Sequence, residues 1–286
     1  MEKWLIFGAN GQLGKEWISF LPKKKTEFRG LSHQHVDITQ ESSLRQALES
    51  YRPDVVVNCA AYTRVDQAEE EAEKAFRVNA HAVEMLGRWC AAHHVALIHY
   101  STDYVFSGHA DDRKKHPGGY PESFPPSPLN VYGMSKLKGE EALLNHCPEA
   151  LILRVSWLCS LHSRCFLTTM LELGETKSEI QVVDDQVSAP TFTHTAVNHA
   201  YELLLQGKRG RAHLACSGET SWYGFAKEIF KITGKSVHVV PVSSEAYPAK
   251  AKRPQWSRLD ISGLDAYGLT VKAWQDELRE VLSKKS

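Results

Sequence analysis

A glycine-rich stretch near the start of the chain constrains the fold more than any other feature. Gly8, Gly11 and Gly14 recur at three-residue spacing, directly after the apolar run 4–7 and at the start of a helical pattern over 12–21. Glycines here allow a tight turn and let the backbone approach a pyrophosphate, which rests on the N–H groups and positive dipole end of the helix. This order predicts a dinucleotide-binding loop; a glycine turn needed only for packing is the alternative.

The first half of the chain alternates short β-branched runs with longer helical patterns. This order is typical of a parallel sheet covered by helices on both faces. Beyond the first strand and helix, we expect strands at 27–31, 54–58, 95–100 and 150–155, and helices at 41–50, 72–93 and 132–146. The fold class predicted is therefore α/β, with a doubly wound parallel sheet of the Rossmann type over residues 1–155.

After Ser156 the alternation becomes less regular. Short strands near 181–183 and 238–240 are interleaved with helices at 193–205 and 222–232. We expect a smaller, discontinuous substrate-binding domain over residues 156–286, with helix 193–205 as a candidate to pack back on the first domain. Between residues 108 and 130 lies a polar loop rich in Pro and Gly, and loops of this length are usually functional or disordered.

Composition limits the range of partners. The 34 Lys and Arg residues balance the 34 Asp and Glu residues, so net charge gives no argument for nucleic acid or a membrane surface. No apolar run approaches the ~20 residues of a membrane span, and the N-terminus lacks the pattern of a signal peptide. We expect a cytoplasmic protein that acts on a small molecule. We also expect reduced core thiols at the six cysteines, which are Cys59, Cys90, Cys147, Cys159, Cys165 and Cys216.

A Tyr and a Lys four residues apart, Tyr132 and Lys136, are the leading candidates for chemistry. They would lie one helical turn apart on one face, where the ammonium would lower the pKa of the phenol from roughly 10. Thr102 follows the strand 95–100, and its hydroxyl could join Tyr132 in donating to a ketone oxygen as hydride arrives, with Tyr132 giving the proton. The alternatives are a surface helix start for the pair and a backbone-bonded strand end for Thr102.

Further blocks follow the glycine loop in a fixed order along the chain. They span residues 36–39, 58–69, 78–80, 101–106, 128–133, 153–157, 183–186, 189–191 and 253–254. Together with the glycine loop and Tyr132-x-x-x-Lys136, they resemble the extended short-chain dehydrogenase/reductase family and, within it, the dTDP-4-dehydrorhamnose reductases. The resemblance implies reduction by NADPH of the C4 ketone of dTDP-4-dehydro-L-rhamnose to dTDP-L-rhamnose, with Thr102, Tyr132 and Lys136 as catalytic residues.

The resemblance also implies where the cofactor binds. Asp37 and Ile38 would lie near the adenine, Asn79 in the helix behind the nicotinamide half, and Lys136 on the nicotinamide ribose. Asp37 capping the turn before Thr39, and Asn79 as a buried hydrogen-bonding residue, remain alternatives. The expected cofactor-binding residues are Gly8, Asn10, Gly11, Gln12, Leu13, Gly14, Ser32, His33, Asp37, Ile38, Ala60, Ala61, Tyr62, Asn79, Tyr132 and Lys136.

The residues after the second strand bear on the choice of cofactor. An acidic residue there commonly binds the ribose 2′-hydroxyl of NAD. Here Leu31 is followed by Ser32 and His33, with Arg29 nearby. Since no carboxylate would repel a 2′-phosphate, we expect NADPH, with NADH as the alternative.

For the sugar nucleotide, the resemblance nominates side chains from several parts of the chain. Trp157 could pack against the apolar face of a deoxysugar, although a core position is an equal alternative, and Arg253 suits a diphosphate by bidentate hydrogen bonding. The expected substrate-binding residues are Val65, Asp66, Thr102, Asp103, Tyr104, Trp157 and Arg253. The sequence indicates no metal ligands and leaves open both a Mg²⁺ requirement and the choice between monomer and homodimer.

Two other functions compete with this interpretation. Dehydratases of the superfamily carry Asp-Glu after the strand-end Thr, whereas this chain has Asp103-Tyr104, which argues against elimination; an epimerase would keep its NAD bound. The regulatory subunit of methionine adenosyltransferase is similar to the reductases and represents a binding module without catalysis. The presence of Thr102, Tyr132 and Lys136 together favours the enzyme.

Overall fold

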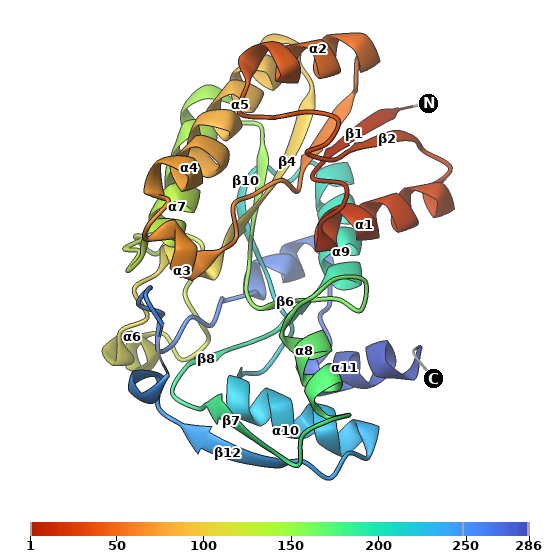
Figure 1. Cartoon of the computed structure of the whole chain (residues 1–286). Helices are drawn as coiled ribbons and strands as arrows, with labels where there is room; N and C mark the ends of the chain where they lie inside the picture. Colours follow the sequence, from red (N-terminus) through yellow and green to blue (C-terminus); the bar gives the residue numbers. More distant parts are fainter. Residues whose placement is uncertain (1, 248, 285–286) are drawn as a thin grey trace.

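A six-stranded parallel sheet forms the centre of the computed structural model, which describes residues 2–247 and 249–284 (Figure 1). The strand order is β10-β5-β4-β3-β1-β2, and every neighbouring pair is parallel. This confirms the predicted doubly wound α/β fold. The strands are β1 (Lys3–Phe7), β2 (Glu27–Leu31), β3 (Val55–Asn58), β4 (Ala96–Thr102), β5 (Leu151–Val155) and β10 (Gly210–Leu214).

Helices cover both faces of the sheet. Successive strand residues point to opposite faces, so Trp4 and Ile6 enter one apolar core while Leu5 and Phe7 enter the other. Because both faces are covered, all of β3 and β5 is buried. The first core contains α1 (Gln12–Phe20) and α9 (Thr193–Leu205), and the second contains α2 (Glu41–Tyr51), α5 (Ala82–Ala92) and α7 (Val131–His146).

The strand order places a crevice at the end of β1. The chain leaves β1 for β2 on one side, while β3 pairs with β1 on the other. In open parallel sheets, ligands bind beyond the carboxyl ends of the strands at such a reversal of strand order. The glycine loop after β1 and the segment after β3 therefore flank this crevice.

A third apolar core lies below the sheet in Figure 1 and belongs to a smaller lobe. Phe225, Ile229 and Leu278 are fully buried in it. Two elements from the second half of the chain, α9 and β10, pack with the large sheet and not with this lobe. The predicted domain boundary at residue 155 stays a prediction. The elements of the lobe are β6 (Leu158–Cys159), α8 (Phe166–Leu173), β7 (Glu179–Val183), β8 (Val187–Ser188), β9 (Thr191–Phe192), β11 (Thr220–Ser221), α10 (Trp222–Thr233), β12 (His238–Val242) and α11 (Trp274–Ser283).

The helix expected over 72–93 is divided into three segments. These are α4 (Ala72–Phe76), the π-helical turn η2 (Arg77–His81) and α5. A Cβ atom on Gly139 of α7 would lie 2.2 Å from the Asn79 carbonyl oxygen, so the two backbones touch at this turn. Such π-helical turns often occur at functional sites, and this one carries a residue expected at the cofactor.

The long polar segment 108–130 is fastened to the body of the protein. Tyr120 is fully buried and stacks on Phe106 with ring centroids 4.3 Å apart. Its hydroxyl donates to Asp112 at 2.7 Å and accepts the Gly108 N–H at 3.1 Å. The segment therefore packs as part of the structure and contains the short helix α6 (Ala110–Lys115).

The remaining short elements connect the larger ones. They are η1 (Leu21–Lys24), α3 (Val65–Ala68), η3 (Asp103–Val105), η4 (Ser244–Ala246) and η5 (Ser262–Tyr267).

Across residues 2–247 and 249–284, no helix has the length and apolar character needed to cross a membrane.

Candidate active site

The backbone of the glycine loop lies so close to neighbouring backbone that two of its positions have no room for a side chain. Gly8 has a φ of +76°, and a Cβ atom on it would lie 2.6 Å from the Ala60 backbone nitrogen. A Cβ atom on Gly14 would lie 2.2 Å from the Gly8 carbonyl oxygen. Gly11 precedes α1, and no side chain caps that helix. The N–H groups of the first turn are thus available to an anion, as a pyrophosphate requires.

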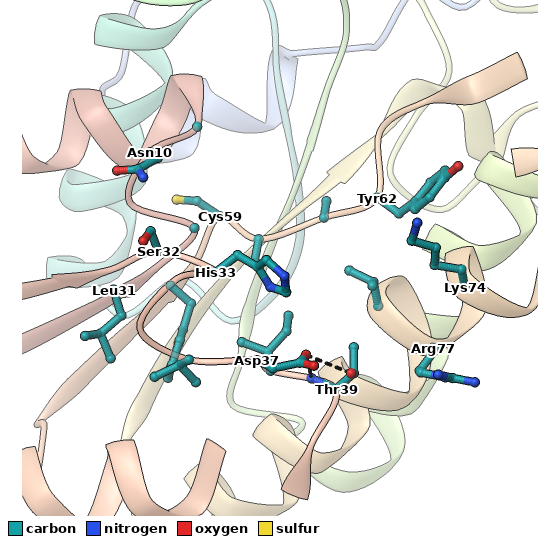
Figure 2. A pocket seen from close by; sticks show the side chains of 18 of the residues that line it. Asn10, Leu31, Ser32, His33, Asp37, Thr39, Cys59, Tyr62, Lys74 and Arg77 are labelled. Atoms are coloured by element: carbon teal, nitrogen blue, oxygen red, sulfur yellow. Dashed lines mark hydrogen bonds between the residues drawn. The ribbon is translucent and has the colours of Figure 1, made fainter. Parts of the chain in front are cut away.

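A cleft of about 980 Å³ opens beside this loop (Figure 2). Lys74 and Arg77, which sequence reasoning missed, lie on the wall formed by α4 and η2. In the sequence they sit in a helical pattern that indicates packing on the sheet, which gave no sign of a binding role. The predicted cofactor residues that line the cleft are Gly8, Asn10, Gly11, Ser32, His33, Asp37, Ile38, Ala60, Ala61 and Tyr62.

Two predicted cofactor residues make structural hydrogen bonds. Asp37 accepts from the Thr39 backbone N–H at 3.0 Å and from its hydroxyl at 2.7 Å, and these bonds lower the pKa of Asp37. Asn79 is fully buried and holds the Tyr62 backbone, accepting from its N–H at 2.8 Å and donating to its carbonyl at 3.0 Å. Asp37 still faces the cleft, whereas Asn79 supports the wall from behind.

A second cavity, of about 640 Å³, continues from the first toward the small lobe. Thr102, Tyr132 and Lys136 line it, together with the predicted Gln12 and Leu13. Thr102 ends β4 and Tyr132 lies in the first turn of α7. The two cavities share the wall residues Asn10, Gly11, Cys59, Ala60 and Ala61. The predicted cofactor loop and the three predicted catalytic side chains therefore meet in one continuous cleft.

Tyr132 is held as a neutral phenol. Burial raises its pKa to about 12, and this effect outweighs a hydrogen bond with Thr102 that lowers the pKa. The sequence predicted that Lys136 lowers the pKa of the phenol, but in this structure the pKa of Tyr132 is raised, so that prediction is wrong. Thr102 also accepts the Tyr104 backbone N–H at 3.1 Å, so the alternative of a backbone-bonded strand end is present as well.

The Lys136 ammonium is directed at β4. It donates to the Tyr100 carbonyl oxygen at 2.6 Å and lies 3.3 Å from His99 Nε2. Burial lowers the pKa of Lys136 to about 8, opposed by the negative charge of Glu140. The ammonium hydrogen-bonds to the strand and not to the phenol, and burial sets the pKa of Tyr132.

Asp103 is buried behind Thr102. It accepts hydrogen bonds from Ser257 Oγ at 2.5 Å and from Thr102 Oγ1 at 3.2 Å. Burial raises the pKa of Asp103 to about 7 despite these two bonds. Ser257 is 154 residues away in the sequence, and nothing in the local pattern marks it; only the fold brings it to the strand end.

The small lobe contributes an aromatic wall. Trp157 and Trp222 stack at 3.6 Å between ring centroids, and both line the catalytic cavity with Val65 and Tyr104. Trp157 is half-buried and has a φ of +42°, so it faces the cavity instead of the core. Trp222 was missed, because its position at the start of a helix resembles an ordinary core residue.

Arg253 and Asp66 bind each other. Two guanidinium nitrogens donate to the two carboxylate oxygens at 2.7 and 3.1 Å, which lowers the pKa of Asp66. Arg253 lines a neighbouring groove of about 750 Å³, which shares Phe166 and Trp222 with the catalytic cavity. The predicted substrate residues thus divide into a group in the cavity and an ion pair at its side.

Three features define an extended short-chain dehydrogenase/reductase: a parallel sheet with a glycine loop at the strand reversal, a Thr at the end of β4, and a Tyr and a Lys one turn apart on α7. The model of the family described as the RmlD substrate binding domain matches residues 2–286, and the chain belongs to this family.

Relatives and solved structures match over the full length. The chain is 35% identical to the spore coat polysaccharide biosynthesis protein SpsK of Bacillus subtilis, over all of this chain and 99% of that protein. It is 35% identical to the dTDP-4-dehydrorhamnose reductase of Aggregatibacter actinomycetemcomitans, over 98% of each. The crystal structure of the Bacillus anthracis dTDP-4-dehydrorhamnose reductase in complex with NADP has a TM-score of 0.94 and 34% identity, over 99% of each chain. These matches confirm the resemblance predicted from the sequence.

Proposed function

We propose that this protein reduces the C4 ketone of dTDP-4-dehydro-L-rhamnose to dTDP-L-rhamnose with NADPH. The observation that carries the proposal is a single cavity lined both by the glycine loop, at residues 10–13, and by Thr102, Tyr132 and Lys136. Full-length relatives named dTDP-4-dehydrorhamnose reductase support the substrate. A relative named for spore coat polysaccharide biosynthesis supports use of the product in polysaccharide.

NADPH, when bound, supplies the hydride to the ketone carbon. The solved relative in complex with NADP supports this cofactor. In this chain the glycine loop would hold the pyrophosphate, and His33 with Arg77 would face the ribose 2′-phosphate from opposite walls of the larger cavity. No acidic residue follows Leu31 directly, so the carboxylate that commonly selects NAD is missing there.

The chain's own hydroxyls complete the reduction. As the ketone carbon gains hydride, its oxygen gains negative charge, which the Thr102 and Tyr132 hydroxyls stabilise by hydrogen bonding. Tyr132 then gives its proton to that oxygen, and the resulting phenolate is reprotonated from solvent. Because burial keeps the Tyr132 pKa at about 12, the phenol carries its proton throughout the neutral range. The buried Lys136 ammonium offsets the negative charge on Tyr132 during the transfer.

The small lobe would position the sugar nucleotide. The stacked Trp157 and Trp222 offer an apolar surface to the deoxysugar ring, beside Val65 and Tyr104. Arg253, held in place by Asp66, lies at the neighbouring groove and suits the diphosphate. The ketone would then lie between this wall and the two hydroxyls.

The test combines purified protein, dTDP-4-dehydro-L-rhamnose and NADPH, with nicotinamide absorbance and product mass as readouts. We expect absorbance to fall and the product to gain two hydrogens, with a large loss of rate in Tyr132→Phe. A flat trace with folded wild-type protein overturns the proposal and favours a binding module without catalysis. Equal rates in the wild type and Tyr132→Phe overturn the assignment of the proton donor.

A further inference from the structure

The nitrogen of Lys136 lies between two groups of β4, the Tyr100 carbonyl oxygen at 2.6 Å and His99 Nε2 at 3.3 Å. The carbonyl oxygen only accepts hydrogen bonds, whereas Nε2 donates or accepts according to the position of the ring proton. His99 is fully buried, and burial holds its pKa well below the usual range, so the ring is neutral. A neutral imidazole has one N–H, and the nitrogen that carries it decides what Lys136 meets.

Asn58 at the end of β3 determines where that proton lies. The Ala60 backbone N–H must donate, and its acceptor at 3.1 Å is the side-chain oxygen of Asn58. The amide nitrogen of Asn58 is therefore the atom that lies 3.1 Å from His99 Nδ1, and an amide nitrogen only donates. Nδ1 thus accepts, and the ring proton lies on Nε2, next to Lys136. Both side chains are buried, where an unpaired polar group is costly.

The contact between His99 Nε2 and Lys136 suits only one form of the lysine. A neutral amine has a lone pair that can accept the Nε2–H, while its own N–H donates to the Tyr100 carbonyl oxygen. An ammonium has three donors and no acceptor, so it meets the Nε2–H donor to donor. Burial lowers the pKa of Lys136 to about 8, and the His99 contact acts in the same direction.

The opposing influence on Lys136 comes from Glu140, one turn later on α7. Its negative charge favours the ammonium, but its carboxylate accepts a hydrogen bond of 2.6 Å from Arg154 and one of 3.1 Å from Arg211. These two guanidinium groups offset much of the charge on Glu140. Burial raises the pKa values of the other titratable side chains around Lys136 and keeps them neutral; they are Cys59, Tyr100 and Tyr132.

We propose that His99, held by Asn58 with its proton on Nε2, is a positioning residue that opposes the positive charge on Lys136 and so sets the alkaline limit of the ketone reduction. Because Lys136 serves that reduction through the charge that it offers to Tyr132, this role of His99 rests on the proposed function. The ring acts through Lys136, which lines the catalytic cavity, and not on the ketone itself.

The first test locates the His99 proton by nuclear magnetic resonance of the full chain labelled with ¹⁵N-histidine, with His99→Met to assign its signals. We expect a neutral ring with its proton on Nε2 from about pH 6 to about pH 9. Asn58→Asp keeps an oxygen for the Ala60 N–H and offers His99 a second oxygen, so the proton should move to Nδ1. A wild-type ring that titrates in this range or carries its proton on Nδ1 overturns the proposal. So does a folded Asn58→Asp protein that keeps the proton on Nε2.

The second test follows the charge of Lys136 by titration of the full chain labelled with ¹³C-lysine, with Lys136→Met to assign the signal. His99→Met removes the Nε2–H, so the pKa of Lys136 should rise by about one unit. The alkaline fall in kcat for ketone reduction should move to higher pH by the same amount. His99→Gln is the matched control: its amide N–H can replace the Nε2–H, so both values should stay near those of the wild type.

A purely structural role for His99 would lower the rate at every pH without moving the alkaline fall. An unchanged Lys136 titration in folded His99→Met therefore overturns the proposal. The titration needs no substrate, so its outcome is separate from that of the proposed function. A raised Lys136 pKa in a protein that reduces no ketone would keep the effect of His99 on Lys136 and overturn the proposed function alone.

Discussion

The Lys136 ammonium donates a hydrogen bond of 2.6 Å to the carbonyl oxygen of Tyr100, which fixes the first turns of α7 against β4. This contact positions Tyr132 one turn earlier on the same helix, next to Thr102 at the end of the strand. Lys136 therefore acts on the phenol through the placement of the helix as well as through its charge.

Replacing Lys136 by Met should remove both effects. We expect kcat for ketone reduction to fall about 100-fold, because the negative charge on Tyr132 loses its counter-charge. In the wild type, burial lowers the Lys136 pKa to about 8, so the ammonium is charged below that pH and neutral above it. The wild-type rate should accordingly decline above about pH 8. A flat pH–rate profile across this range would contradict the role given to the ammonium.

Replacing Thr102 by Val keeps the shape of the side chain but removes its hydroxyl. Because that hydroxyl lines the cavity with Tyr132 and would donate to the ketone oxygen, we expect kcat to fall about 100-fold with a small change in KM. Thr102→Ser restores a hydroxyl and is the matched control, which should recover most of the rate. Steady-state kinetics on the wild type and the two variants tests this prediction. Equal rates in all three proteins would show that the Thr102 hydroxyl has no role in the reaction.

Asp103 should make stability depend on pH. Burial raises its pKa to about 7 in the folded protein, while the unfolded value is about 3.9. The folded state thus binds more protons between these values, so the free energy of unfolding should fall as pH rises from about 4 to about 7, by roughly 4 kcal/mol at most. Asp103→Asn should flatten this dependence in urea unfolding. Ser257→Ala leaves the carboxylate in place and should retain it.

His33→Asp should change the choice of cofactor. A carboxylate near the end of β2 would hydrogen-bond to the ribose 2′-hydroxyl of NADH and repel the 2′-phosphate of NADPH. We expect the ratio of kcat/KM for NADPH to that for NADH to fall at least about tenfold. His33→Asn is uncharged and should change the ratio far less. If the ratio stays constant in both variants, His33 does not face the 2′-position.

Trp222→Ala should weaken binding of the sugar nucleotide. Its ring stacks on Trp157 at 3.6 Å, so its loss frees Trp157 and opens the cavity wall. Aromatic pairs of this kind contribute about 1 kcal/mol, which predicts a KM about fivefold higher with little change in kcat. Trp222→Phe keeps an aromatic ring and serves as the control. An unchanged KM in the alanine variant would place the substrate elsewhere.

Local patterns were sufficient to predict the sheet and most of its helices. The apolar run 55–57 could only be a buried strand, and the glycine loop identified the first crossover. The division of 72–93 was missed because the π-helical turn depends on the contact of Gly139 with the Asn79 backbone, which is remote in sequence. Periodicity alone carries no information about such a contact.

For the site, the sequence identified side chains better than it identified their partners. Thr102, Tyr132 and Trp157 all line the predicted cavity. The Lys136 ammonium, however, hydrogen-bonds to a carbonyl oxygen of β4, and Ser257 reaches Asp103 only through the fold. Hydrogen-bond partners and desolvation set the pKa values, and both are properties of the packed structure.

The position of β10 has a consequence for synthesis of the chain. β10 completes the sheet beside β5, but the ribosome makes it after α8, β7 and α9. Until residues 210–214 emerge, one side of β5 offers unpaired backbone groups, which are a template for association with other chains. Translation that stalls within the preceding segment would therefore leave a nascent chain prone to aggregation, and a folding assistant would be needed most at that stage.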